Sequence, residues 1–257
     1  MKGLIIIYSS YGPLCTEVYE LSKPVGYSTG DVEYYKERLT GREGKTLEVG
    51  CGTGRVLVPL LESGIAIEGI DYSDAMLESC RNQCHERGLS TVLYHGNMQD
   101  FSLDEMYADI IIPAGSFQLI ENRREAVQAL QNFYNHLQFG GRLTLDLFLD
   151  VELEVGKVSM RTWEIPPREV ITLESRLIEL DFLKQRTVSL LKYEKWSEGN
   201  LLQSELQRFP LCWYGNHEFK LLLESIGYTE VSISADYSYG TAPTHAGGIM
   251  TFEATKR

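Results

Sequence analysis

Glycines at three alternate positions interrupt the chain between a short apolar run and a helix-like segment, in the stretch Leu47-Glu48-Val49-Gly50-Cys51-Gly52-Thr53-Gly54-Arg55. Because glycine lacks a Cβ, the backbone there can adopt positive φ and approach a ligand closely. The helix that follows would direct its free N–H groups at the same ligand. The pattern is therefore typical of a site for a nucleotide or nucleoside.

The spacing of these glycines selects between cofactors. A dinucleotide site is expected to carry G-x-G-x-x-G, whereas here the sixth position is Arg55. Glu48 closes the strand before the first glycine, where a carboxylate would repel a pyrophosphate and suits a cationic group. The pattern E-x-G-x-G-x-G resembles motif I of the class I S-adenosylmethionine (SAM) methyltransferases. That resemblance implies SAM as cofactor, bound by Glu48, Gly50, Cys51 and Gly52.

The end of the second expected strand carries Asp71, followed by Tyr72. A carboxylate at this place can accept hydrogen bonds from both ribose hydroxyls of a nucleoside. Tyr72 and Met76 could then form walls beside the adenine. The alternative is that Asp71 only marks the entry to the next helix.

Two later segments extend the resemblance. The segment His95–Phe101 resembles the G-D-M-x-D-F stretch of the same methyltransferases, with Asn97 in place of the aspartate that binds the adenine amino group. An Asn oxygen can still accept from that amino group, and the Met98 N–H could donate to the ring. In the resembling proteins the fourth strand ends beside the methionine part of SAM, which here predicts contacts from Ala114 and Gly115.

The N-terminal segment narrows the resemblance. Tyr11 and Tyr19 lie in a stretch similar to the Y-D-x-L-A…Y-D pattern of small-molecule methyltransferases, including those that N-methylate amino sugars. Gly12 and Glu20 replace its aspartates. In that branch such tyrosines fold over the SAM carboxylate, so the resemblance implies the same for Tyr11 and Tyr19. The alternative is that they are ordinary core or surface aromatics.

Strand-like and helix-like segments alternate from 45 to 150, which favours a parallel sheet with right-handed crossovers. With the resemblance, this predicts a doubly wound, seven-stranded Rossmann-like α/β methyltransferase fold. Apolar residues recur at every second position in 156–212, which predicts an inserted antiparallel sheet of three or four strands. The expected strands are 45–49, 66–70, 91–95, 108–112, 142–149, 229–236 and 247–255, and the helices between them are 54–63, 74–87 and 123–138. Gly140 and Gly141 are expected to end the last of these helices.

The same pattern divides the chain into three parts. Residues 1–40 are expected to form an N-terminal helical lid. Residues 41–155 and 213–257 would form the SAM-binding domain. The insertion 156–212 would cover the substrate, form a homodimer interface, or do both.

Composition limits the partners. The 257-residue chain has a net charge of −12, which disfavours a nucleic-acid substrate because such binding depends on Lys and Arg contacts. Five cysteines without a C-x-x-C pair indicate reduced, intracellular usage. Cys80 and Cys84 share a helix face with Leu77, so we interpret them as core residues and expect no metal. Without an apolar run of membrane-span length, we expect a cytoplasmic protein with a small-molecule methyl acceptor and no membrane partner.

The catalytic groups stay unassigned. Transfer to an O or N nucleophile can proceed by orientation alone, and a base is needed only if the nucleophile must lose a proton. The candidate bases are His217, Tyr214, His245 and Asp150, none of which the sequence favours. An acceptor pocket could draw on Tyr11, Tyr19, Trp163, Arg208, Trp213 and Tyr214.

Three other functions share these motifs. A SAM-binding protein without transferase activity would carry the same cofactor residues. A protein or nucleic-acid methyltransferase would need a broad, basic groove. An aminopropyl transferase would bind decarboxylated SAM and would lack a carboxylate-binding end.

Overall fold

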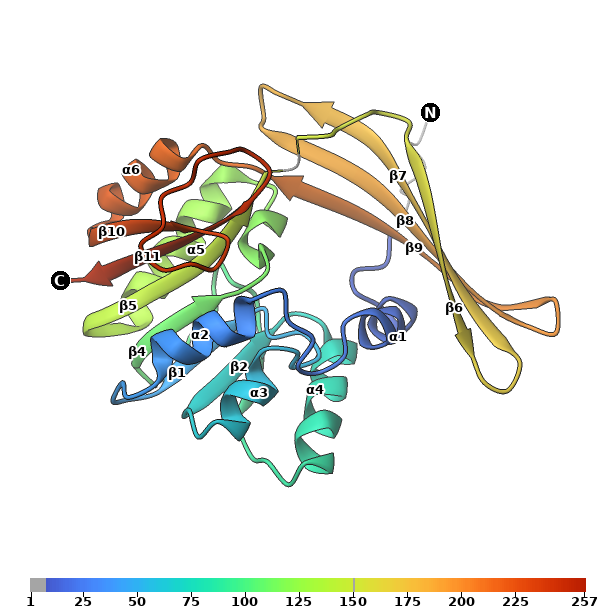
Figure 1. Ribbon diagram of the computed structural model, residues 1–257, viewed down its shortest axis with the longest axis horizontal. Helices are drawn as coiled ribbons and strands as arrows, with labels where there is room; N and C mark the ends of the chain where they lie inside the picture. Colours follow the sequence, from blue (N-terminus) through green and yellow to red (C-terminus); the bar gives the residue numbers. More distant parts are fainter. Residues whose placement is uncertain (1–7, 150) are drawn as a thin grey trace.

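The computed structural model describes residues 8–149 and 151–257. A seven-stranded sheet lies between layers of helices, and a four-stranded sheet projects from one side of this core (Figure 1). The strand order of the larger sheet is β10-β11-β5-β4-β1-β2-β3. This is the predicted doubly wound fold with an inserted antiparallel sheet.

The central sheet contains β1 (Thr46–Val49), β2 (Ile67–Asp71), β3 (Leu93–His95), β4 (Tyr107–Ile112), β5 (Leu137–Phe148), β10 (Tyr228–Ala235) and β11 (Ile249–Lys256). The inserted sheet contains β6 (Val158–Ile165), β7 (Glu169–Asp181), β8 (Arg186–Ser197) and β9 (Asn200–Cys212). The helices are α1 (Pro13–Ser22), α2 (Asp31–Leu39), α3 (Leu57–Glu62), α4 (Asp74–Glu86), the 3₁₀ helix η1 (Ser116–Leu119), α5 (Arg123–His136) and α6 (Asn216–Ile226).

Burial explains the core of the sheet. Every residue of β4 is buried, as expected for a central strand that carries helices on both faces. β1 pairs in parallel with β2 and β4, and β4 pairs in parallel with β5. β11 pairs antiparallel with β5 and with β10, so the last two strands form an antiparallel hairpin. The carboxyl ends of β1, β2 and β4 therefore meet at one edge.

Two boundaries differ from the sequence expectation. α3 begins at Leu57 because the backbone from Gly52 to Val56 forms turns before the helix. The expectation that Gly140 and Gly141 end a helix was wrong: α5 ends at His136 and both glycines lie inside β5. At Gly141 a Cβ would lie 2.8 Å from the carbonyl oxygen of Gln138, so the glycine permits the irregular start of β5.

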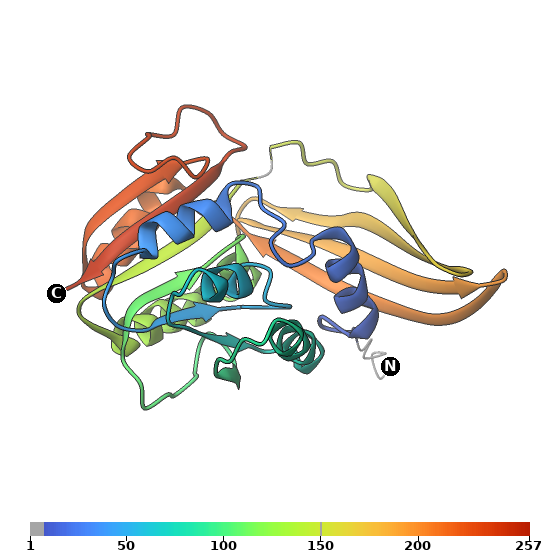
Figure 2. The same cartoon turned by 60° about the horizontal axis from the view of Figure 1, so that its bottom comes forward.

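The inserted sheet packs against the N-terminal helix (Figures 1 and 2). Leu14, Cys15 and Val18 of α1 share a buried cluster with Met76 of α4 and with residues of β7 and β8. The Glu205 carboxylate of β9 accepts from the Leu14 and Cys15 N–H groups at 3.0 and 3.3 Å. A carboxylate at a helix N-terminus is stabilised by the free N–H groups there. These contacts hold α1 between the core and the insertion.

Candidate active site

A cavity of about 470 Å³ lies where the carboxyl ends of β1, β2 and β4 meet α1 and the inserted sheet. Its size falls within the range of small-molecule sites. In open α/β sheets, ligands bind outside the carboxyl ends of the strands. The cavity is thus at the place where the sequence motifs predicted the cofactor.

Most of the predicted cofactor residues line this cavity. They are Tyr11, Tyr19, Gly50, Gly52, Asp71, Tyr72, Met76, Asn97, Met98, Ala114 and Gly115. Glu48 and Cys51 are not among the residues that line it, and both side chains are buried. For Cys51 only backbone contacts with a ligand remain, since its thiol packs toward Gly69.

The glycine turn and Asp71 form one unit. The Asp71 carboxylate accepts from the Gly52 N–H at 2.8 Å and from the Ser73 N–H at 2.9 Å. Gly52 has φ +54, and a Cβ there would meet nothing within 4 Å, so its backbone faces open space. Burial raises the pKa of Asp71, and the two N–H groups oppose that rise. Asp71 therefore shapes the turn, in addition to its predicted role with the ribose.

Glu48 is an unusual buried carboxylate. It is 2% exposed, and its Oε2 has no hydrogen-bond partner among the described residues. Burial raises the pKa of Glu48 well above its usual range, and the nearby Arg55 guanidinium opposes the rise. The Arg55 guanidinium is itself held by the Asp31 carboxylate at 2.5 Å. An acceptor without a partner at the end of β1 fits a cofactor with a cationic end.

The two predicted N-terminal tyrosines reach the same cavity from α1 and the residues before it. The Tyr11 carbonyl accepts from the Ser73 hydroxyl at 2.7 Å, which ties the start of α1 to α4. Burial raises the pKa of Tyr11 and of Tyr19, so both phenols are neutral donors at neutral pH. The Arg55 guanidinium lies close enough to Tyr19 to oppose the rise in its pKa. Tyr19 thus lies between the cavity and the ion pair of Arg55 and Asp31.

The segment after β3 is held in place by a side chain of α5. Asn132 of α5 donates from one amide nitrogen to the Met98 carbonyl at 3.3 Å and to the Phe101 carbonyl at 3.1 Å. This fixes the backbone on which Asn97 and Met98 face the cavity. At the rim, the Tyr72 ring stacks on His95 with centroids 5.9 Å apart.

The turn after β4 is held by a buried carboxylate that the sequence did not reveal. Ala114 and Gly115 both have positive φ, at 56° and 72°. The Ala114 N–H donates to the Asp146 carboxylate at 3.0 Å, and the Tyr237 hydroxyl donates to the same oxygen at 3.0 Å. Thr251 donates to the other oxygen at 2.9 Å. Asp146 therefore positions the part of the cavity predicted to border the methionine end of SAM.

The opposite wall comes from the inserted sheet. Leu191 and Tyr193 of β8 and Gln207, Phe209 and Leu211 of β9 line the cavity. Sequence alternation alone could have grouped these residues on one face, but it could not say which face points toward the cofactor. The Tyr193 hydroxyl donates to the Cys15 thiol at 3.4 Å, and burial raises the pKa of that thiol to about 11.

Several predicted acceptor residues and bases lie elsewhere. Trp163, Arg208, Trp213 and Tyr214 do not line this cavity. Arg208 instead pairs with Glu121 at 2.5 Å, and Tyr214 is buried in the main core. His217 and His245 are exposed and outside the cavity, and Asp150 lies outside the described residues.

The residues in and beside the cavity fit the SAM molecule predicted by the motifs. Glu48 offers an unpartnered acceptor, the backbone at Gly52 faces open space, and Asp71 ends β2 beside both. When bound, SAM supplies a methyl group activated by a sulfonium. No metal-binding group of three or more His, Cys, Asp or Glu residues occurs in the described part of the chain.

Known proteins with similar sequences indicate the enzyme class. Residues 46–141 match the methyltransferase domain. A putative methyltransferase of Geobacillus sp. (strain WCH70) is 25% identical over 237 residues, which cover 86% of this chain and 89% of that protein. These matches span the glycine turn, Asp71 and the Asn97 segment. The protein is a SAM-dependent methyltransferase.

Two further comparisons place this methyltransferase among its relatives. The dTDP-3-amino-3,6-dideoxy-α-D-glucopyranose N,N-dimethyltransferase of Streptomyces fradiae is 28% identical over 134 residues, covering 50% of this chain and 51% of that protein. The structure of the sugar N-methyltransferase KedS8 from Streptoalloteichus sp. ATCC 53650 has a TM-score of 0.76 at 19% identity, covering 100% and 98% of the two chains. At that identity the likeness shows the shared fold, and solved structures with this fold include SAM complexes. The predicted enzyme class and cofactor are confirmed.

Within residues 8–149 and 151–257, no helix has both the length and the apolar character needed to cross a bilayer.

Proposed function

We propose that this methyltransferase methylates an amine nitrogen of a small molecule held between the cofactor turn and the inserted sheet. The observation that carries this proposal is the position of the cavity between the cofactor residues and the inserted sheet. Residues of α1 and of β8 and β9 lie across from the glycine turn, Asp71 and Ala114. A wall this close to the cofactor residues favours an acceptor of small-molecule size over a macromolecule.

The titratable groups of the cavity favour nitrogen over an aliphatic hydroxyl. Its described lining contains no histidine, and its one carboxylate, Asp71, already accepts from two backbone N–H groups. An alcohol needs a base to remove its proton, whereas a neutral amine attacks with its own lone pair. The new N–C bond would form as the C–S bond breaks, and the resulting ammonium would lose its proton to water. S-adenosylhomocysteine would be the second product.

Relatives support the same choice. The Streptomyces fradiae relative is named for N,N-dimethylation of a dTDP-amino sugar, and KedS8 is named as a sugar N-methyltransferase. Both names describe nitrogen acceptors on small molecules. The match to the Streptomyces fradiae relative covers 51% of that protein's length, so its acceptor is a guide to the chemistry and not to the whole site.

We also propose roles for the residues of the cofactor half. Asp71 would bind the ribose, Asn97 and Met98 the adenine, and Glu48 the amino group of the methionine moiety. Residues 1–40 would act as a lid through Tyr11 and Tyr19, and the insertion 156–212 would cover the acceptor. The contacts of α1 with both sheets support a lid coupled to the acceptor wall.

The test is a panel of small acceptors read by S-adenosylhomocysteine release and mass spectrometry. The panel contains amino sugars, aminocyclitols and alkyl amines, each with its matched hydroxyl compound. We expect a gain of one or two methyl groups on the nitrogen of at least one amine and none on its hydroxyl partner. Methylation of hydroxyl compounds alone, or of added protein or RNA alone, would overturn the proposal.

Compartment and assembly are part of the proposal. All five cysteines are free and buried, which supports a reducing, cytoplasmic setting, and the net charge of −12 opposes a nucleic-acid partner. A homodimer through the outer face of the inserted sheet is supported by the exposed Met160 and Leu206. Sedimentation velocity of the wild type and of Met160→Lys would test it.

A further inference from the structure

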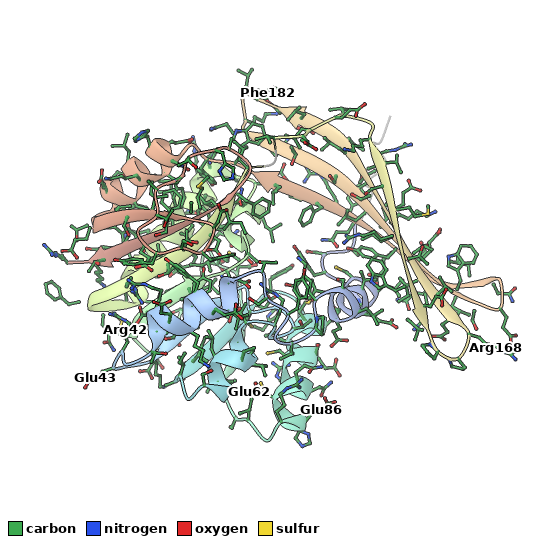
Figure 3. The ribbon with its side chains drawn as sticks, viewed as in Figure 1. Arg42, Glu43, Glu62, Glu86, Arg168 and Phe182 are labelled. Carbon is green, nitrogen blue, oxygen red and sulfur yellow. The ribbon has the colours of Figure 1, made fainter. Side chains whose placement is uncertain are left out.

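A second cavity, of about 300 Å³, adjoins the first beneath the inserted sheet. Phe148, Phe209 and Leu211 line both cavities, so the two cavities adjoin at these side chains. The second cavity lies toward the β7–β8 hairpin, where Phe182 marks the end of the sheet opposite to Arg168 (Figure 3). A molecule whose amine occupies the first cavity would therefore extend its remaining atoms into the second.

Hydroxyl groups form one wall of this second cavity. Ser159 of β6, Ser175 of β7, and Thr187 and Ser189 of β8 all line it. Cross-strand pairing places Ser159 opposite Ser175, so these hydroxyls come from neighbouring strands. Side chains at alternate positions of a strand share a face, which brings Thr187 and Ser189 to the same side. Such a wall can donate to and accept from hydroxyl groups of a ligand.

Aromatic and aliphatic side chains form the facing wall. Phe148 lies at the end of β5, and Trp213 follows β9. Trp213 is held edge-to-face by Phe182, with centroids 5.9 Å apart and planes at 72°. A fixed aromatic surface opposite several hydroxyls suits a ring that carries hydroxyls at its rim and C–H groups on its faces.

The charges of this cavity exclude one class of ligand. Its described lining contains one cation, Lys157, and two carboxylates, Glu152 and Glu154. A diphosphate is bound by several Arg or Lys side chains or by a helix N-terminus, and a net negative lining repels it. The relative from Streptomyces fradiae is named for a dTDP-linked acceptor, so the lining of this chain points to a different substrate.

We propose that the second cavity binds the distal part of the acceptor and that this part is a hydroxylated, uncharged or cationic ring without phosphate. The inference rests on the proposed amine methylation and names its substrate class. The acceptor would be an amino glycoside or aminocyclitol conjugate, with the reacting amine beside Tyr193 and Phe209 and a second ring between Ser189 and Trp213.

Two cations in the first cavity bear on whether the acceptor carries a phosphate. Lys23 and Arg161 line that cavity, where Lys23 lies 5.4 Å from the Tyr19 ring centroid. Tyr19 is the residue predicted to approach the SAM carboxylate, so Lys23 is placed at the methionine end. Arg161 is two residues from Ser159 on β6, about 7 Å along the strand. Arg161 could therefore meet a phosphate near the second cavity, as could Lys157 in the lining of that cavity, and the test includes Arg161.

The first experiment fills the second cavity. Ser189→Trp places a large ring inside it, and Leu190→Trp is the matched control because the adjacent side chain points to the other face of β8. With an accepted amine from the panel, we expect Ser189→Trp to raise the acceptor KM about tenfold or more. The KM of Ser189→Trp for SAM should change less than about twofold. The KM values of Leu190→Trp for SAM and for the acceptor should also change less than about twofold. Equal acceptor KM values in both variants would overturn the inference.

The second experiment compares two probes with the same amino sugar. Calorimetry on the enzyme saturated with S-adenosylhomocysteine would measure binding of a disaccharide of 3-amino-3,6-dideoxy-glucopyranose linked to glucose, and of the dTDP-linked sugar. We expect the disaccharide to bind about tenfold more tightly and Trp213→Ala to weaken its binding. Tighter binding of the dTDP sugar, weakened by Arg161→Met, would overturn the inference, and so would no binding of either probe. The proposed function would stand in each case if the panel still yields an N-methylated amine, so the two failures are distinguishable.

Discussion

Replacing Asp146 with asparagine should change how stability depends on pH. Asp146 is fully buried on β5, and burial raises its pKa from 3.8 to about 6 despite the donors Ala114, Thr251 and Tyr237. Because its pKa is higher in the folded state than in the unfolded state, ionisation costs more in the folded protein. This cost is absent below pH 3.8, grows as the pH rises toward 6, and is constant above that.

The size of this destabilisation follows from the shift in the pKa of Asp146. A rise from 3.8 to about 6 corresponds to about 3 kcal/mol of destabilisation at neutral pH. About 2 kcal/mol of that change falls between pH 4.5 and 7.5. Asparagine keeps an acceptor for the Ala114 N–H and does not titrate. Relative to the wild type, Asp146→Asn should therefore gain about 2 kcal/mol in free energy of unfolding as the pH rises across this range.

Urea unfolding of both proteins at four pH values between 4.5 and 7.5 measures this difference. Asp104→Asn, at an exposed carboxylate, is the control and should follow the wild type within about 0.5 kcal/mol. Other buried carboxylates titrate equally in both proteins and cancel in the comparison. A difference that stays flat with pH, or that grows toward acid, would refute the account of Asp146.

Three further predictions concern the cofactor. Asp71→Ala should weaken SAM binding by about 2–4 kcal/mol in calorimetry, because the ribose loses a charged acceptor and the Gly52 N–H loses its partner. If the variant binds SAM with wild-type affinity, Asp71 only shapes the helix entry. Glu48→Gln should cost about 1.5–3 kcal/mol of SAM binding and should leave adenosine binding unchanged, whereas equal losses for both ligands would place Glu48 away from the methionine end. SAM at 100 times its dissociation constant should raise the free energy of unfolding by about 2.7 kcal/mol, and NAD at the same concentration should not; a thermal-denaturation series with both ligands decides this.

The cofactor half of the site was predictable because it is local in sequence. Gly50, Gly52 and Asp71 lie at strand ends, and a parallel sheet brings such ends to one edge. The exceptions have physical reasons. The motif could not show that the side chains of Glu48 and Cys51 are buried and do not line the cavity, because strand residues alternate between faces and burial depends on the packing of α2 and α4.

The acceptor half was not predictable to the same degree. The period-two pattern predicted the inserted sheet, but the arch of the sheet decides which face meets the core (Figure 1). Arg208 and Tyr214 therefore turned out to serve an ion pair and the main core. Asp146 was hidden because its partners Ala114, Tyr237 and Thr251 are far apart in the sequence.

The central claim is that the cofactor sulfur faces an acceptor cavity bounded by the inserted sheet. A crystal structure with S-adenosylhomocysteine bound tests it most directly. The account predicts the ribose at Asp71 and the sulfur facing the cavity bordered by Tyr193, Phe209 and Phe148, with Tyr11 and Tyr19 closing over the methionine end. A sulfur that faces open solvent along a broad groove, with the inserted sheet turned away from it, would contradict the account.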